Sequence, residues 1–269
     1  MGFSKSLRAG VAVALLAFVT APAVAQTSGT TDYVPQVGQE GKDVIWVPTP
    51  QTLVDKMLDI AEAKPGDYVI DLGSGDGRTV ITAAKRGIKA LGIEYNPKLV
   101  ELSKRAAEKE GVSDRAQFVQ GDIFQTDFSQ ATVLTMFLLT ELNYRLRPTI
   151  LEMKPGTRVV SNTFDMGDWS PDGFVRAEED CQAYCRAYFW VVPAKVGGTW
   201  RMGEGELALE QTYQKVRGTL TVNGKPTGVE GSLRGDQITL KAGDREYTGK
   251  VSGDTIEGAG WRATRQKGA

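Results

Sequence analysis

The chain has 269 residues, with 32 Lys or Arg and 33 Asp or Glu, so its formal charge is −1. This balance provides no strong positive field for nucleic acid, and 41% hydrophobic residues are enough for a packed core. Histidine is absent from the sequence, which excludes histidine general bases, catalytic triads and histidine metal sites. Two cysteines cannot form a four-cysteine zinc site. We therefore expect neither a metal site nor a nucleic-acid partner.

The first 25 residues have the pattern of a secretory signal peptide. Lys5 and Arg8 precede an apolar run at 9–21, and the residues PAVA at 22–25 end in a cleavage site of the A-x-A type. A membrane anchor is the alternative, but the apolar run is shorter than the roughly 20 residues that a spanning helix needs. The sequence predicts a periplasmic or secreted protein with no stable membrane span after signal cleavage.

Helical and strand patterns alternate from about residue 50 to residue 192. Thr49 is expected to cap the first helix, with Pro50 at its first helical position, and Pro148 is expected to break the last helix. The expected helices are 50–63, one that ends at Gly87, one that begins at Asn96-Pro97, and 143–153. The expected strands are 68–72, 90–94, one that begins at Phe118, 133–139, 158–162 and 188–192. This alternation predicts an α/β fold with a doubly wound, mostly parallel, Rossmann-like sheet.

The sequence changes character after about residue 197. Glycine becomes frequent, and the turn signals Asn223-Gly224, Gly235-Asp236 and Gly253-Asp254 follow one another. Residues 231–238 and 249–256 resemble each other, and each predicts a hairpin. We expect a signal peptide at 1–25, a main domain at 26–197 and a small antiparallel β module at 198–269. The module is either a docking surface or a structural cap, and the cap is the simpler interpretation.

A glycine-rich segment carries the most chemistry. Residues 71–77 read DLGSGDG, directly after an expected strand and before an expected helix. The spacing is G-x-G-x-G, whereas a dinucleotide site has G-x-G-x-x-G, so an oxidoreductase is disfavoured. Asp71 and Asp76 favour a cationic ligand over a phosphate. Glu94 ends the next strand, where its carboxylate can accept from ribose hydroxyls, and Asp122 ends the third and can accept from an adenine amino group.

These motifs resemble the class I S-adenosylmethionine-dependent methyltransferases over about residues 40–195. Residues 71–78 (DLGSGDGR), 83–87 (AAKRG), 94–97 (EYNP) and 47–50 (VPTP) are similar to the mitochondrial lysine methyltransferases that modify ATP synthase and the adenine nucleotide translocase. The resemblance implies S-adenosyl-L-methionine as the cofactor. The residues expected to bind it are Thr49, Asp71, Gly73, Ser74, Gly75, Glu94 and Asp122.

The expected reaction is methyl transfer to an amine, either a protein lysine or a small amine. Catalytic residues are not assigned. Glu141, Asp165 and Asp168 are carboxylates to examine near the expected cleft, with Tyr95 and Phe164 as possible walls. An Asn-Pro-Pro-Tyr motif is missing after the fourth expected strand, which argues against the subgroups that methylate amides and base amino groups.

Two questions stay open from the sequence. Cys181 and Cys185 form either a disulfide, if the chain between them bends into a loop, or two buried thiols. S-adenosylmethionine is made in the cytoplasm, whereas the N-terminus predicts export. The alternative function is therefore an exported, non-catalytic nucleoside- or protein-binding module on a methyltransferase fold.

Overall fold

The computed structural model describes residues 1–3 and 33–266. The chain divides into two units, residues 1–32 and residues 33–269. All the described helices and strands belong to the second unit. The predicted signal peptide, apart from residues 1–3, lies outside the described residues. Among the described helices, none is both long and apolar enough to cross a membrane.

The main domain is built on a seven-stranded sheet in the described part of the chain, in the order β3-β2-β1-β4-β5-β7-β6. Strands β1 to β5 pair in parallel, and β7 and β6 join antiparallel at one edge. The expected mostly parallel, doubly wound sheet is confirmed. Its strands are β1 (Tyr68–Leu72), β2 (Lys89–Glu94), β3 (Ala116–Gln120), β4 (Val133–Met136), β5 (Arg158–Asn162), β6 (Gly173–Arg176) and β7 (Arg186–Val191).

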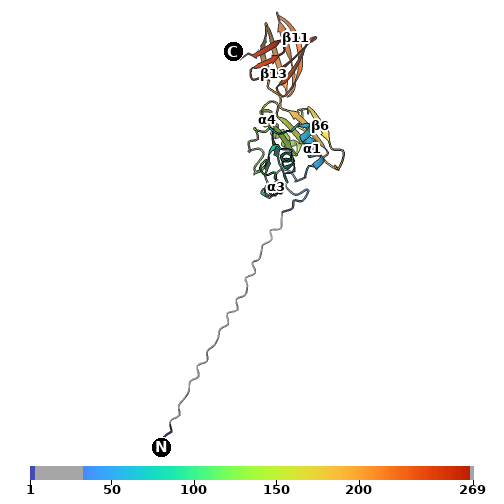
Figure 1. Cartoon of the computed structure of the whole chain (residues 1–269). Helices are drawn as coiled ribbons and strands as arrows, with labels where there is room; N and C mark the ends of the chain where they lie inside the picture. The colour runs from blue at the N-terminus through green and yellow to red at the C-terminus, as the bar shows by residue number, and fades with distance from the viewer. Residues whose placement is uncertain (4–32, 267–269) are drawn as a thin grey trace. The chain divides into compact units, whose positions relative to one another are not determined.

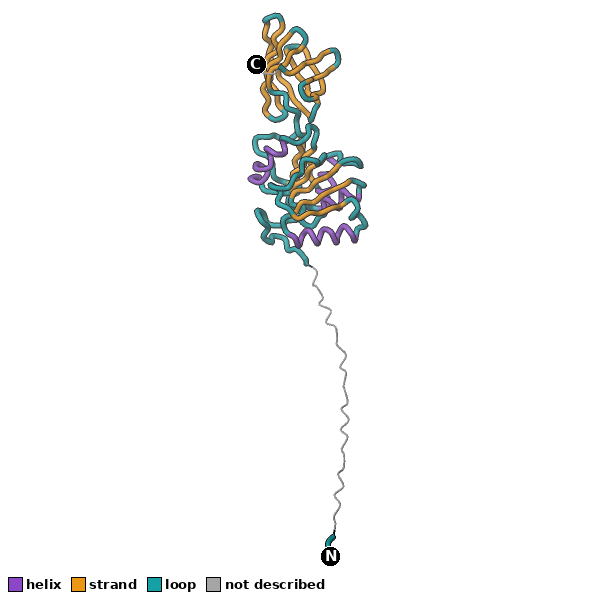
Figure 2. Tube along the Cα trace, turned by 90° about the vertical axis from the view of Figure 1, so that its left-hand side faces the viewer, coloured by secondary structure: helices purple, strands orange, loops and turns teal. Residues whose placement is uncertain are grey.

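Helices cover both faces of this sheet (Figure 2). In the described residues they are α1 (Gln51–Ile60), α2 (Arg78–Lys85), α3 (Pro97–Lys109) and α4 (Thr140–Leu151). The apolar sides of α1, α2 and α3 pack on one face of the sheet, and α4 packs on the other with Trp169 and Met166. Two apolar cores therefore hold the strands from both sides, which leaves the carboxyl ends of the strands free to form a site.

Several expected boundaries are wrong. Helix α4 continues through Pro148 because Leu142, Leu146 and Ile150 are buried against the sheet on both sides of it, while Pro148 itself is exposed. Strand β4 ends at Met136, so the rest of its apolar run is a loop. Strand β6 was not expected.

Thr49 does not cap α1. The residue that precedes the helix is Pro50, which makes no side-chain cap. The Thr49 hydroxyl is buried and accepts a hydrogen bond from Asn162 Nδ2 at 3.2 Å. Thr49 therefore fixes the chain before α1 to the carboxyl end of β5.

The C-terminal part is a closed antiparallel barrel, with β11 and β13 labelled in Figure 1. Its strand order is β10-β11-β12-β13-β14-β15-β8-β9. The three glycine turn signals each lie at a hairpin, and the two similar segments form the β11–β12 and β13–β14 hairpins. The strands are β8 (Gly198–Met202), β9 (Gly205–Thr212), β10 (Lys215–Val222), β11 (Lys225–Arg234), β12 (Gln237–Ala242), β13 (Arg245–Ser252), β14 (Thr255–Gly258) and β15 (Trp261–Arg265).

Apolar side chains from all eight barrel strands fill the interior of the barrel, as the alternation in the sequence requires. The barrel contacts the main domain through the β9–β10 hairpin and through Arg234 of β11, whose guanidinium lies 5.7 Å from the Phe189 ring centroid. In the hairpin, the Tyr213 hydroxyl donates to Asp168 at 2.9 Å, and Gln214 Nε2 donates to the carbonyl of Ser170 at 2.7 Å. The Tyr213 ring also stacks on Trp169, with ring centroids 5.9 Å apart.

Candidate active site

The glycine loop between β1 and α2 forms the floor of a pocket at the carboxyl ends of the strands. Gly73 and Gly75 have φ values of 73° and 56°, in the left-handed region that favours glycine. The amides of Gly73 and Ser74 both donate to the carbonyl of Ile93, which ties the loop to β2. The empty volume of the pocket is about 1040 Å³, counting the part open to solvent.

Asp71 lies near the end of β1, with its side chain buried at the pocket wall. Its carboxyl accepts a hydrogen bond from the Thr135 hydroxyl of β4 at 2.6 Å. Burial raises the pKa of Asp71; together with the nearby carboxylates of Asp76 and Glu94, and against the lowering effect of the Thr135 bond, it brings the pKa to about 7. A cation in the pocket would therefore gain from the ionised form of Asp71.

Glu94 ends β2 and points back at the glycine loop. Its Oε2 accepts from the Gly75 amide at 2.9 Å, and its Oε1 accepts from the Asn96 amide at 2.8 Å. Burial raises the pKa of this carboxyl, while these backbone bonds oppose the rise. Each carboxylate oxygen can still accept a further donor from the pocket, which is the arrangement that two neighbouring hydroxyls require.

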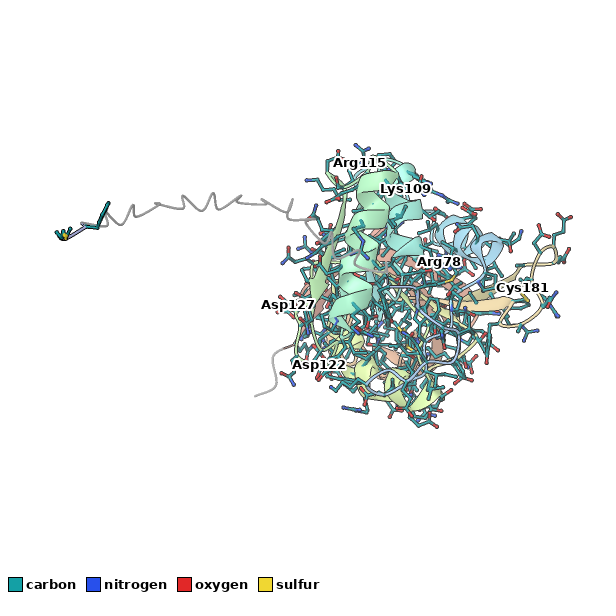
Figure 3. The ribbon with its side chains drawn as sticks, turned by 90° about the horizontal axis from the view of Figure 1, so that it is seen from below. Arg78, Lys109, Arg115, Asp122, Asp127 and Cys181 are labelled. Atoms are coloured by element: carbon teal, nitrogen blue, oxygen red, sulfur yellow. A yellow bond between two sulfur atoms is a disulfide. The ribbon has the colours of Figure 1, made fainter. Side chains whose placement is uncertain are left out.

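Asp122 lies two residues beyond β3, and both of its oxygens have partners. Oδ1 accepts from the Phe124 amide, and Oδ2 accepts from Lys42 Nζ at 2.6 Å. The Lys42 bond lowers the pKa of Asp122. Figure 3 shows Asp122 and Cys181 on different sides of the molecule. Asp76, which was expected to favour a cationic ligand, is already paired with Arg78 at 2.6 Å.

Residues 38–46, here called the cover segment, contribute a wall that sequence reasoning missed. The Gly38 amide donates to the Trp46 carbonyl and the Trp46 amide to the Gln39 carbonyl, each at 2.9 Å, which closes the segment into a small hairpin. A Cβ built on Gly75 would lie 2.7 Å from the Trp46 indole nitrogen. Trp46 therefore lies directly over the glycine loop. The only signal in the sequence is an apolar stretch next to VPTP, and nothing in it points to a loop thirty residues away.

The pocket continues past β4 into aromatic side chains. Phe137, in the loop after β4, lines the pocket and stacks on Phe164, with centroids 6.1 Å apart. Tyr95 lines the side next to Lys42. Phe164 was expected as a wall and reaches the pocket lining only through Phe137.

The three carboxylates that were singled out do not line the pocket. Asp165 is exposed and caps a turn by accepting from the Gly167 amide. Asp168 binds Arg147 and Tyr213 at the barrel contact. Glu141 is exposed in the first turn of α4. No contact among the described residues places any of the three at the pocket, so their role as a base stays an untested prediction.

Comparison with known proteins places the site in a family. The model of the ANTKMT methyltransferase domain matches residues 71–173. A protein-lysine N-methyltransferase of Saccharolobus islandicus is 45% identical over 150 residues, 55% of this chain and 89% of that protein.

The chain belongs to this family of S-adenosylmethionine-dependent methyltransferases. An ATP synthase lysine N-methyltransferase of Xenopus laevis is 35% identical over 47% of this chain and 56% of that protein. A crystal structure described as an RNA methyltransferase from Salinibacter ruber with S-adenosyl-L-homocysteine is 45% identical. It covers 56% of this chain and 96% of that chain, with a TM-score of 0.52.

The pocket of the methyltransferase fits its cofactor on its own geometry. The Ser74 hydroxyl is buried without a hydrogen-bond partner among the described residues, so it can pair with a polar ligand group. Gly92 leaves room for this hydroxyl, because a Cβ there would lie 2.5 Å from Ser74 Oγ. The seven residues expected to bind the cofactor all line this one pocket: Thr49, Asp71, Gly73, Ser74, Gly75, Glu94 and Asp122. Their contacts with the cofactor stay a prediction.

Proposed function

We propose that this methyltransferase transfers the methyl group of S-adenosyl-L-methionine to the ε-amine of lysine in a protein. The observation that carries the proposal is the pocket itself, in which the glycine loop, Asp71 and Glu94 meet at the carboxyl ends of β1 and β2. The choice of lysine is supported by the names of the similar proteins from Saccharolobus islandicus and Xenopus laevis. When bound, the cofactor supplies a methyl group on a sulfonium, whose sulfur leaves as a neutral thioether.

Different residues of the pocket bind different parts of the cofactor. Glu94 accepts from ribose hydroxyls, and the glycine loop lets the backbone approach the ligand without obstruction by a Cβ. Asp71 supplies negative charge beside the cationic end of the ligand, and Trp46 covers the loop and keeps water out. Because the sulfonium is already reactive, holding the amine in line with the methyl group provides much of the rate.

The lysine amine has to be neutral when it reacts. The sequence has no histidine, and Glu141, Asp165 and Asp168 lie outside the pocket lining. We therefore expect the amine to lose its proton to water, so that the rate increases with pH toward the ordinary lysine pKa of about 10.4.

The test is transfer of labelled methyl groups. The purified full chain is incubated with methyl-labelled S-adenosylmethionine and a cell-envelope extract, and products are digested and analysed for ε-N-methyllysine. We expect label in protein that is released as methyllysine. Label that is sensitive to ribonuclease, or confined to small amines, would contradict the proposal.

Two glycine variants test whether the glycine loop is required for methyl transfer. Gly75→Ala places a Cβ 2.7 Å from the Trp46 indole, whereas Gly111→Ala has nothing within 4 Å. Both glycines have positive φ, at 56° and 66°, so both variants carry a similar backbone cost of about 1–2 kcal/mol. We expect Gly75→Ala to lose at least about tenfold in methyl transfer and Gly111→Ala to keep most of it. Equal losses would mean that the glycine loop does not hold the cofactor.

We further propose that the protein is exported to the periplasm or secreted. The signal-peptide pattern at 1–25 supports this, and so does the disulfide between Cys181 and Cys185, since disulfides persist in oxidising compartments. N-terminal sequencing of the protein from fractionated cells tests the proposal. We expect a periplasmic or secreted form that begins at Gln26. A protein found only in the cytoplasm with residues 1–25 intact would overturn it.

A further inference from the structure

The side of the pocket that receives the amine can be located from the sheet. The strand order reverses between β1 and β4, and ligands of such sheets lie over this point. Glu94 and Asp122 follow β2 and β3, so the nucleoside belongs to that side. The methyl group then lies toward β4, where Phe137 lines the pocket. This assignment rests on the proposed function.

Three aromatic side chains, here called the aromatic cluster, meet at this side. Phe137 stacks on Phe164, and Tyr184 contacts the edge of Phe137, with ring centroids 5.1 Å apart and planes at 62°. They come from three segments: the loop after β4, the loop after β5 and the loop between β6 and β7. Phe137 and Phe164 are half-buried, whereas Tyr184 is 41% exposed, so Tyr184 is the member that an arriving protein can touch.

The disulfide between Cys181 and Cys185 closes a short loop that carries Tyr184. Tyr184 has φ of 58°, a conformation that is unfavourable for a tyrosine and persists only where the surroundings impose it. The loop is also fixed at both ends. The Thr52 hydroxyl donates to the carbonyl of Glu179 at 3.3 Å, and the Ala177 amide donates to the carbonyl of Cys185 at 2.8 Å.

We propose that Tyr184 is a wall of the lysine site, and that the disulfide holds it there. The four methylene groups of a lysine pack on an aromatic ring while its nitrogen reaches past the ring toward the methyl group. Tyr184 acts on the substrate by contact, and Cys181 and Cys185 are positioning residues that act through it.

The charge next to this loop fits the same substrate. Glu178, Glu179 and Asp180 directly precede Cys181, all three are exposed, and none of them is in an ion pair with a described residue. Negative charge at the edge of a binding site increases the rate at which a basic segment arrives. The preferred acceptor is therefore a lysine in a basic, accessible segment of a protein.

The experiment measures binding of the acceptor separately from binding of the cofactor. A fluorescent oligolysine is titrated into the full chain in the presence of S-adenosylhomocysteine, with an oligoarginine of equal length to measure attraction by charge alone. We expect wild type to bind oligolysine more tightly than oligoarginine. We expect Tyr184→Ala to weaken oligolysine binding about tenfold and to leave the affinity for S-adenosylhomocysteine unchanged. Tyr184→Phe should bind as wild type does.

Variants of the disulfide complete the test. Cys181→Ser with Cys185→Ser should weaken oligolysine binding as Tyr184→Ala does, and adding Tyr184→Ala to it should cause little further loss. Tyr144→Ala is the matched control, because Tyr144 is 44% exposed and packs near Arg147, outside the aromatic cluster. Unchanged binding by Tyr184→Ala, or no preference for oligolysine in wild type, would overturn the inference. The proposed function is judged separately, by methyllysine formed in the extract.

Discussion

Two buried carboxyl groups at neighbouring strand ends are held in different ways. Glu94 accepts from two backbone amides, of Gly75 and Asn96, which support its ionised form. The partner of Asp71 is the Thr135 hydroxyl, and its burial is deeper. Asp71 is therefore the group whose charge depends on pH in the neutral range, and Glu94 is the more permanent acceptor.

The pKa of Asp71 makes cofactor binding dependent on pH. Burial, together with the nearby carboxylates, raises this pKa to about 7 from an ordinary value of about 3.9, so the cofactor-free protein keeps a proton that the unfolded chain has lost. The free energy of unfolding of the cofactor-free protein therefore falls as pH rises from about 4 to 7. A cationic ligand favours the ionised carboxyl, so affinity for S-adenosylmethionine should increase about tenfold from pH 6 to pH 8.

Calorimetry at several pH values checks this expectation. The Asp71→Asn variant keeps an oxygen that can accept from Thr135 but cannot ionise, so its affinity should be lower and nearly independent of pH. Protons released on binding near pH 7 should also disappear in the variant. The same pH dependence in wild type and variant would show that another group is responsible.

Individual residues of the site were predictable only where they belong to strand ends. Asp71, Glu94 and Asp122 could be placed because parallel strands end at one edge of a sheet. The contacts of Trp46 and Lys42 could not be predicted. Their partners lie about thirty and eighty residues further along the chain, and the local spacing of apolar residues carries no information on contacts at such distances.

The cover segment is the element whose contacts decide access to the pocket. Besides the bonds of its own hairpin, the cover segment contacts the rest of the domain through Lys42. The Lys42 Nζ binds Asp122 at 2.6 Å and lies 5.0 Å from the Tyr95 ring centroid. The Lys42 side chain is 35% exposed, so solvent screens this ion pair and makes it weak. A contact this weak can open and close readily.

Removal of the lysine charge should speed the release of cofactor. We expect Lys42→Met to increase the dissociation rate of S-adenosylmethionine about two- to fivefold at low salt, and high salt to abolish the difference. Stopped-flow displacement measures both. Lys85→Met is the control, because Lys85 makes an exposed pair with Glu110 at 2.6 Å and does not line the pocket. A release rate that Lys42→Met leaves unchanged at low salt would mean that the cover segment is held in another way.

Elements were predictable where local pattern and burial agree. The strands β1, β2 and β5 are short apolar segments between turn signals, and the structure has them close to the expected bounds. Helix α4 and strand β4 differ because tertiary packing decided them. Apolar anchors on both sides of Pro148 keep the helix continuous, and the apolar run after Met136 serves the pocket instead of the sheet. Strand β6 follows from pairing with β7, which no local pattern shows.

At the scale of the whole molecule, Tyr213 is one of the side chains that join the barrel to the main domain, together with Gln214 and Arg234. The Tyr213 ring stacks on Trp169 and lies 5.5 Å from the Arg147 guanidinium, and its hydroxyl binds Asp168. Aromatic pairs of this kind contribute about 0.5–1.5 kcal/mol beyond the area that they bury. The stacking at Tyr213 is therefore one modest contribution to the coupling between the two parts.

Loss of Tyr213 should separate the unfolding of the two parts. We expect wild type to unfold in one calorimetric transition and Tyr213→Ala to show two, with methyl transfer retained. Tyr247→Ala is the control, because Tyr247 contacts Trp261 within the barrel, and its loss should lower the barrel's stability without removing the contact to Asp168. A single transition in Tyr213→Ala would show that other contacts carry the coupling.

The barrel closes by pairing β15 with β8, its last strand with its first. The Gln266 amide accordingly donates to the carbonyl of Thr199, and Arg265 reaches the carbonyls of Lys195 and Gly197. The chain thus leaves the barrel beside the point where it entered. Because the barrel closes on itself and shares no strand with the seven-stranded sheet, its gain or loss would leave every strand of that sheet with its neighbours.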